Sequence, residues 1–143
     1  MTSNRNWLLL ALASAEDGRM SPLQLQKAMF LMRMEADDLL GPQFYRFVPY
    51  NYGPFNSTIY SDIEALRHEG LVLNESEGRH WPTHMITPDG LKRVEQVRDS
   101  ADTPLVDFLK QVVDWVKGQT FASLLTAIYD KYPDYARNSV FRN

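Results

Sequence analysis

Apolar residues recur at steps of three and four along most of the chain, and this spacing predicts a mainly helical protein. The stripes predict helices over residues 4–15, 22–41, 56–69, 88–100, 104–117 and 121–131. Ser21, Thr87 and Asp102 stand shortly before a proline, as capping residues at a helix start do. Gly70 and Gly118 are suited to end a helix. The same periodicity places four further side chains on inward faces: Leu39, Tyr60, Leu91 and Phe121.

Two short runs, residues 71–74 and 85–87, predict the strands of a β-hairpin. Three helices, a hairpin and a helix that starts directly from the second strand form the element order of a winged-helix domain. Residues 56–69 then stand in the position of the recognition helix. We therefore expect a mainly α fold with a small β-hairpin, in which residues 1–100 form a winged-helix-like domain. Residues 101–143 should form a C-terminal helical extension wrapped on the same body, with a homodimer as the alternative.

The segment between these helices, residues 43–55, is rich in aromatic side chains and also contains two prolines and a glycine. Proline restricts its own backbone and disfavours helix at the residue before it, so the segment cannot be a regular helix. Phe47 and Phe55 are expected in the core. Tyr50 and Tyr52 are expected on the surface, where aromatic rings serve as anchors for a protein partner.

Composition narrows the function classes. The 143 residues carry 15 Lys and Arg against 18 Asp and Glu, a net charge of −3, and the acidic excess lies in residues 61–100. A duplex-binding protein usually shows a basic footprint, which this distribution lacks. The absence of cysteine excludes disulfides and thiolate metal sites within the chain. Its apolar runs are too short to cross a bilayer and no secretory signal is recognisable, so we expect a cytoplasmic protein without membrane contact.

The helix predicted over residues 56–69 has an acidic outer face. Six residues are expected to face outward: Thr58, Ser61, Asp62, Ala65, His68 and Glu69. Two are acidic and none is Lys or Arg, whereas base reading draws on Arg, Lys, Asn or Gln, so a solvated face is favoured over DNA readout. In the alternative of a DNA-binding regulator, dimerisation would have to bring basic residues together. The contacts of that alternative are Thr58, Ser61, Arg79, Lys92 and Arg93.

Candidate chemistry is sparse. His80 and His84 would share a face of an extended strand, but spacing fixes no third ligand, so no metal site is expected. The chain has no glycine-rich phosphate loop, nucleophile elbow or metalloprotease helix. We therefore expect a protein that is not an enzyme and needs no cofactor.

Three sequence motifs carry a resemblance to a known family. They are Leu25-Gln26-Lys27-Ala28-Met29-Phe30, then Phe47-x-Pro49-Tyr50-x-Tyr52-Gly53-Pro54-Phe55, then Ile59-Tyr60 with Leu66-x-x-x-Gly70-Leu71. Together they resemble the Leu-Gln-Lys helix and aromatic-Gly-Pro turn of Panacea-domain proteins. That family includes SocA-like antitoxins and phage- or defence-associated neighbours of toxin genes. The resemblance implies a small non-enzymatic protein that binds a toxin or effector-like protein and neutralises or delivers it.

A shorter segment, from Ile86 to Leu91, resembles the strand-exit motif of MarR- and PadR-type winged-helix regulators. Its threonine caps a helix and its glycine permits close packing, so it bears on fold rather than on DNA binding. The hypothesis of a protein-binding module places the contacts on the aromatic turn and the neighbouring helix. Its candidate partner-binding residues are Tyr50, Tyr52, Pro54, Asp62 and His68.

Overall fold

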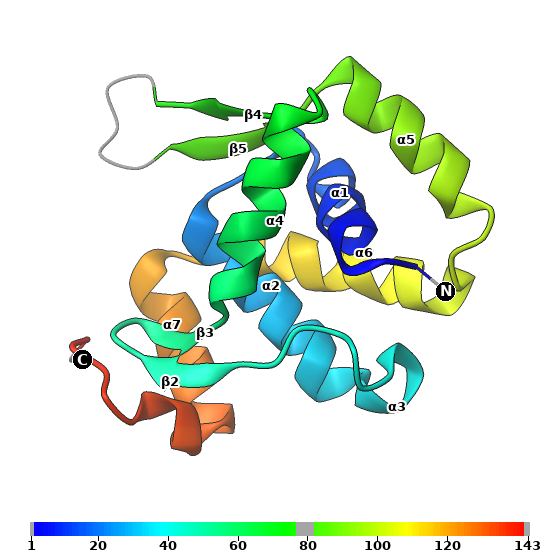
Figure 1. Ribbon diagram of the computed structural model, residues 1–143. Coiled ribbons are helices and arrows are strands. Elements are labelled where there is room, and N and C mark those ends of the chain that lie inside the picture. Colours follow the sequence, from blue (N-terminus) through cyan, green and yellow to red (C-terminus); the bar gives the residue numbers. More distant parts are fainter. Residues whose placement is uncertain (1, 77–81, 142–143) are drawn as a thin grey trace.

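The computed structural model describes residues 2–76 and 82–141 and is mainly helical, with small antiparallel sheets (Figure 1). The helices are α1 (Asn4–Ser14), α2 (Pro22–Glu35), α3 (Asp37–Leu40), α4 (Ser57–His68), α5 (Pro88–Arg98), α6 (Thr103–Lys117), α7 (Phe121–Lys131) and the 3-10 turn η1 (Pro133–Ala136). The strands are β1 (Arg19–Met20), β2 (Val48–Tyr50), β3 (Gly53–Phe55), β4 (Val72–Glu75) and β5 (Thr83–Ile86). The expected mainly α fold with a small β-hairpin is confirmed.

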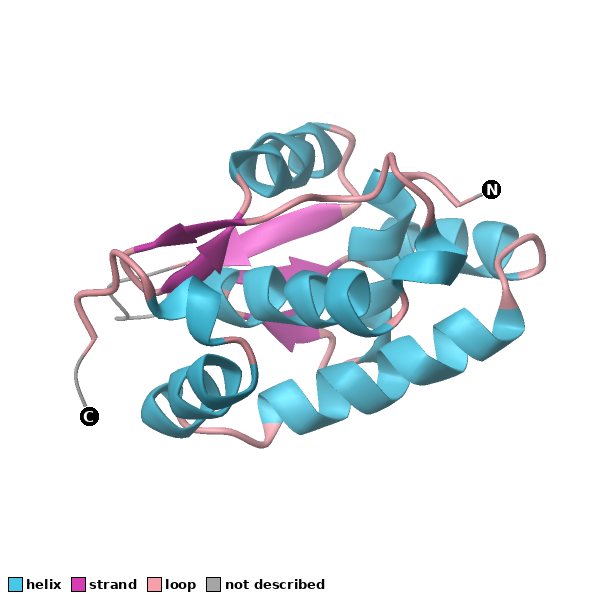
Figure 2. Cartoon of the chain, turned by 90° about the horizontal axis from the view of Figure 1, so that it is seen from below, coloured by secondary structure: helices cyan, strands magenta, loops and turns pink. Residues whose placement is uncertain are grey.

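The strands form two separate sheets beside the helices (Figure 2). The expected hairpin pairs β4 with β5, and β1 adds to the free side of β5 to give the order β1-β5-β4. The second sheet is the two-stranded hairpin β2–β3, which lies inside the aromatic segment. The sequence predicted an extended or looping segment there but not a hairpin.

Capping side chains set the helix starts as expected. The Ser21 hydroxyl accepts from the Gln24 amide, and the Gln24 side chain accepts from the Ser21 amide. Thr87 and Asp102 cap α5 and α6 by the same kind of bond. Each cap satisfies helix-end amides that have no partner within the helix.

The helix predicted over residues 22–41 is in fact divided, because α2 stops at Glu35 and the short α3 follows. The buried Arg33 guanidinium lies at this break, donates to the Gly41 carbonyl at 2.7 Å and pairs with Asp37 at 3.1 Å. The change of direction turns Leu39 outward, with 62% of its surface exposed, so its inward placement was wrong.

Three other inward placements were also wrong: Tyr60, Leu91 and Phe121 are each about half exposed. Each lies at the margin of its helix's buried stripe and is only partly covered by neighbouring side chains. On α5 only Gly90 and Val94 are buried, since this helix lies on α1 through a narrow strip.

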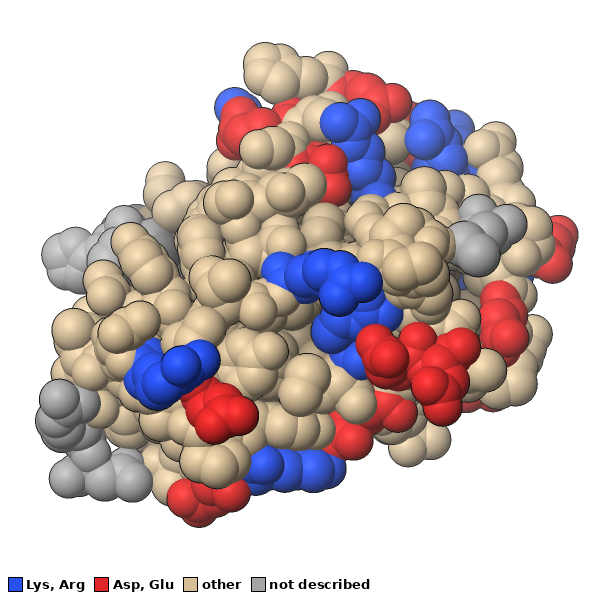
Figure 3. All heavy atoms as spheres, turned by 60° about the horizontal axis from the view of Figure 1, so that its bottom comes forward, with Lys and Arg blue, Asp and Glu red and all other residues tan. Residues whose placement is uncertain are grey.

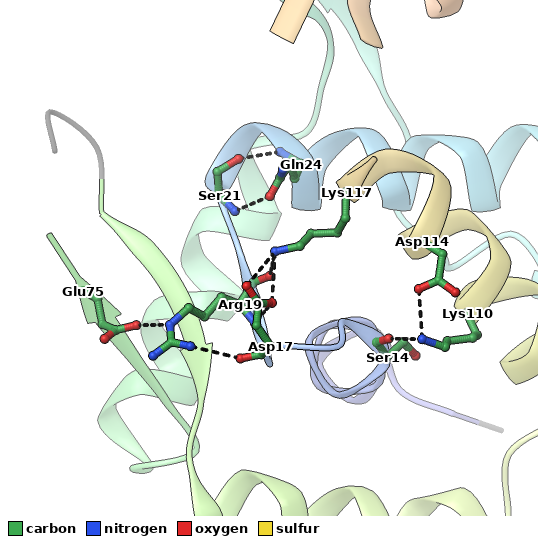
Figure 4. Close-up of polar contacts among 9 residues, drawn as sticks. All are labelled: Ser14, Asp17, Arg19, Ser21, Gln24, Glu75, Lys110, Asp114 and Lys117. Carbon is green, nitrogen blue, oxygen red and sulfur yellow. Dashed lines mark hydrogen bonds and ion pairs between the residues drawn. The ribbon is translucent and has the colours of Figure 1, made fainter. Parts of the chain in front are cut away.

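The core is built around α1, whose residues 7–12 are all buried. Helix α6 packs against both α1 and α2, so the C-terminal extension lies on the same body as the N-terminal part. Polar contacts fasten it there (Figure 4): the Lys117 ammonium lies 3.0 Å from the Asp17 carboxylate and donates to the Arg19 carbonyl at 2.6 Å. About two helical turns earlier, Lys110 donates to the Ser14 carbonyl at 2.9 Å.

The tail after α7 docks on the body. The rings of Tyr132 and Tyr135 pack edge-on against Phe30, with centroids 5.2 and 4.7 Å away. Within the described ranges 2–76 and 82–141, none of the helices has the length and apolar content that crossing a bilayer requires.

A candidate protein-binding surface of aromatic side chains

The β2–β3 hairpin accommodates two prolines because of its register. Pro49 lies opposite Pro54, between the Val48–Phe55 pair and the Tyr50–Gly53 pair that closes the turn. Antiparallel pairs alternate between hydrogen-bonded and non-hydrogen-bonded, and a residue without an N–H fits the second kind. Pro49 therefore supplies no N–H donor at the edge of β2, whereas the Pro54 carbonyl faces α2.

Two adjacent side chains of α2 hold this hairpin. The Gln26 amide group donates to the Asn56 carbonyl at 2.8 Å and accepts from the Asn56 amide at 2.9 Å. The Lys27 ammonium donates to the Pro54 carbonyl at 2.9 Å. The Leu-Gln-Lys motif and the Gly-Pro turn, separate in the sequence, are thus one structural unit.

Gly53 lets the hairpin approach α7. Its φ is +93°, a left-handed conformation that favours glycine, and a Cβ here would lie 3.3 Å from Cε1 of Tyr129. The tail closes the other side of the turn, where the Val140 amide donates to the Asn51 carbonyl at 2.9 Å. The hairpin is therefore fixed by α2, α7 and the tail together.

Aromatic rings gather around this hairpin on the outside of the protein. We call aromatic surface the set Tyr50, Tyr52, Phe55, Tyr60, Phe121 and Phe141. Four of its rings are about half exposed: 51% for Tyr50, 48% for Tyr52, 47% for Tyr60 and 48% for Phe121.

The rings form two contact chains. Phe55 lies between Tyr50 and Tyr60, with centroids 5.0 and 5.6 Å away. Phe121 lies between Tyr52 and Phe141, with centroids 5.6 and 5.7 Å away. Each ring therefore restricts its neighbours, and the exposed rings are held at low conformational freedom.

The surface placements of Tyr50 and Tyr52 and the core placement of Phe47 are confirmed, while Phe55 is only partly buried. Pro54, a residue of strand β3, is buried. It therefore helps to position the aromatic surface and is not itself open to a partner. Tyr60 and Phe121 were not predicted from the sequence to contribute to the aromatic surface. Their only sequence signal was an aromatic residue at the margin of a helical stripe.

Asp62 was expected to face outward, and this was wrong. The residue is 8% exposed, and its carboxylate accepts from the Tyr45 hydroxyl at 2.6 Å and pairs with the Arg5 guanidinium at 3.1 Å. Burial, together with the neighbouring carboxylate, raises the pKa of Tyr45 well above its ordinary value. Asp62 therefore joins α4 to α1 and to the aromatic segment, and offers no charge to a partner.

Along the outer face of α4, Thr58, Ser61, His68 and Glu69 are exposed as expected, whereas Ala65 is half-buried. The one arginine on this face, Arg67, forms an ion pair at 3.0 Å with Glu64, the residue one turn earlier. Arg67 was not placed on this face from the sequence, and its ion pair with Glu64 neutralises its charge. The face is therefore polar and does not form a basic ridge.

The remaining contacts of the DNA-binding alternative are dispersed. Lys92 is exposed on α5, and Arg93 lies 4.0 Å from the Glu69 carboxylate. Arg79 and His80 lie outside the described residues. On the face shown in Figure 3, charged side chains form scattered groups of both signs separated by broad uncharged areas.

No metal site emerges within residues 2–76 and 82–141, where no three His, Cys, Asp or Glu side chains gather. His84 is buried and its Nδ1 lies 2.8 Å from the Asn74 side chain. Burial lowers the pKa of His84, which favours its neutral form.

An apolar groove lies on another face, between α2, α6 and α7. Leu31, Phe108 and Trp115 line it, and an ion pair between Glu35 and Lys131 stands at its rim. Glu35 and Lys131 pair with each other, and Gln111 and Tyr132 also line the groove.

Comparison with models of known protein families gives no match to this chain, and a search among curated proteins finds no significant relative.

Proposed function

We propose that the chain is a non-enzymatic protein-binding module that uses the aromatic surface to hold a partner protein. The observation that carries this proposal is the group of four half-exposed rings supported by the β2–β3 hairpin. Exposed aromatic rings that stay ordered supply large contact area at low entropic cost, and Tyr is enriched among residues that dominate binding energy. Pro49 supports the same proposal, since it removes a donor from the edge of β2 and leaves recognition there to side chains.

The resemblance to Panacea-domain antitoxins gives this module its role. In that role the partner is a toxin or effector-like protein that the module neutralises or delivers. The motifs that carry the resemblance, the Leu-Gln-Lys helix and the aromatic-Gly-Pro turn, are the parts that hold the aromatic surface in place.

Site-specific photo-crosslinking in host cells tests the proposal. A p-benzoylphenylalanine at position 60 or 121 should give a discrete protein adduct. The matched control places the same group at Leu91, which is equally exposed but lies on α5, away from the hairpin in Figure 1. Adducts of equal strength at all three positions, or at none, contradict the proposal.

The partner identified in this way allows a quantitative test. The double change Tyr50→Ala and Tyr52→Ala should weaken binding at least about tenfold, since truncating a central aromatic contact typically costs more than 1 kcal/mol. Leu91→Ala should leave the affinity unchanged. An unaltered affinity in the double variant would place the contact elsewhere.

A second candidate function is a winged-helix transcriptional regulator that acts as a dimer. The arrangement that favours it is the order α1, β1, α2, α4, β4, β5, with α3 and the β2–β3 hairpin inserted between α2 and α4. Together with the sheet order β1-β5-β4, it supports a winged-helix interpretation of the first hundred residues. Binding to the protein's own promoter should then weaken steeply as salt rises. Loss of that binding in Lys92→Glu together with Arg93→Glu would favour this alternative over the first.

A further inference from the structure

Lys27 is an unusual group in this fold. It carries an ammonium group on α2, yet only 2% of the residue is exposed. A buried cation normally lies beside a carboxylate, because removing a charge from water is costly. Here the contact that holds it is the carbonyl of Pro54, at 2.9 Å.

The groups around the ammonium come from three elements. Strand β3 contributes the backbone of Gly53 and Pro54. Helix α7 contributes Tyr129: a Cβ on Gly53 would lie 3.5 Å from both the Tyr129 hydroxyl and Cε of Lys27, and this hydroxyl shares a hydrogen bond with Ser139 at 2.6 Å. On α2 itself, the nearest charged side chains are engaged elsewhere, Arg33 with the Gly41 carbonyl and Glu35 with Lys131. Burial accordingly lowers the pKa of Lys27 from its ordinary 10.5 to about 7.

Access to water requires movement of the hairpin. The lysine lies under the Gly53-Pro54 backbone, so the ammonium is hydrated only when β2–β3 separates from α2. Gln26 lies beside it on the same helix, and its two bonds to the Asn56 backbone break in the same movement.

We propose that the Lys27–Pro54 contact makes the hairpin proton-sensitive: the open form, with the lysine in water, takes up a proton that the closed form releases. Opening is then favoured as pH falls and suppressed as pH rises. The opening equilibrium depends on pH between about pH 7 and 10.5, the pKa values of Lys27 in the closed and open forms. Below pH 7 both forms carry the proton, and the dependence disappears. That this opening regulates the aromatic surface rests on the proposed function, whereas the coupling of opening to proton uptake does not.

Amide hydrogen exchange of the isolated chain tests this without any partner. Exchange of an open amide speeds up about tenfold per pH unit, because hydroxide catalyses it. If opening requires one proton, the open population falls by about the same factor per pH unit. The Asn56 and Val140 amides, which report on hairpin attachment, should then exchange at a nearly constant rate between pH 7.5 and about 9.5.

Two variants sharpen the test. In Lys27→Met the same amides should regain the rise of about tenfold per pH unit. In Lys110→Met the flat profile should persist, since Lys110 makes an equivalent bond to a backbone carbonyl at 2.9 Å but is about half exposed. A wild-type rate that rises tenfold per unit, or a flat profile retained in Lys27→Met, overturns the proposal.

If Lys27→Met fails to fold, a direct measurement replaces it. The ¹³Cε signal of Lys27 in the wild-type chain should titrate near pH 7, whereas titration above pH 10 would overturn the proposal. Failure of either test leaves the crosslinking test of the proposed function unaffected.

Discussion

Replacing Gly90 by alanine gives the sharpest test of the packing between α5 and the sheet. A Cβ at this position would lie 2.3 Å from the Leu71 carbonyl oxygen and 2.6 Å from Cγ1 of Ile86. The Ile86 side chain can rotate, but the Leu71 carbonyl belongs to the backbone and also accepts from the Thr87 amide at 3.1 Å. The helix and the strand would therefore have to move apart, and this hydrogen bond would lengthen.

The expected loss follows from these contacts. Overpacking costs about 1–3 kcal/mol, and weakening one backbone hydrogen bond adds roughly 0.5–1.5 kcal/mol. The higher helix propensity of alanine offsets about 1 kcal/mol. The net free energy of unfolding should fall by about 2 kcal/mol, and the Tm by roughly 6 °C.

Urea unfolding followed by circular dichroism measures this loss, with Gly118→Ala as the matched control. Gly118 has a φ of −80°, and an added Cβ would lie at ordinary contact distance, 3.4 Å, from the nearest atom. The control should be as stable as the wild type or slightly more stable. If Gly90→Ala is no less stable than Gly118→Ala, the close approach described here is wrong.

Three further predictions follow from buried or exposed polar groups. Tyr45→Phe removes a donor from the buried Asp62 carboxylate and should lower the free energy of unfolding by about 1–3 kcal/mol in a denaturant titration, whereas Tyr52→Phe should change it by less than about 0.5 kcal/mol. The free energy of unfolding of the wild type should rise by up to about 1.4 kcal/mol per pH unit above pH 7, because the unfolded chain then binds a proton that folded Lys27 has lost. Thermal melts of Lys27→Met at the same pH values should lack this rise. Tyr50→Ala should weaken partner binding in calorimetry while shifting the Tm by only a few degrees, since its ring is half exposed; a large Tm loss would assign it a structural role instead.

The helix starts could be predicted because their signals are local. Ser21, Thr87 and Asp102 act within one turn of the chain, and the structure places each as the expected cap. Gly90, in the segment from Ile86 to Leu91, was also predicted from the sequence to permit close packing. Its close approach to the Leu71 carbonyl bears this out. Strand β1 could not be predicted, since two residues show no periodicity and its partner strand, β5, is distant in the sequence.

Asp62 shows a different limit. It lies three residues after Ile59 and four before Leu66, so helical spacing alone places it on the buried face. The outward prediction took Ile59, Ile63 and Leu66 as the whole inward set, and the two groups that make burial of Asp62 tolerable, Arg5 and Tyr45, are 57 and 17 residues away. Pairing between distant residues decided the orientation, and a single sequence gives no measure of it.

The composition of the aromatic surface has a consequence for synthesis on the ribosome. Tyr50, Tyr52, Phe55 and Tyr60 emerge early, whereas Phe121, which contacts Tyr52, and Phe141, which contacts Phe121, are translated about sixty to ninety residues later. A nascent chain therefore presents only four of the six rings, on a hairpin that α7 and the tail have not yet fixed. Full affinity for a partner should arise only once translation has passed residue 141, so that incomplete chains compete poorly for it.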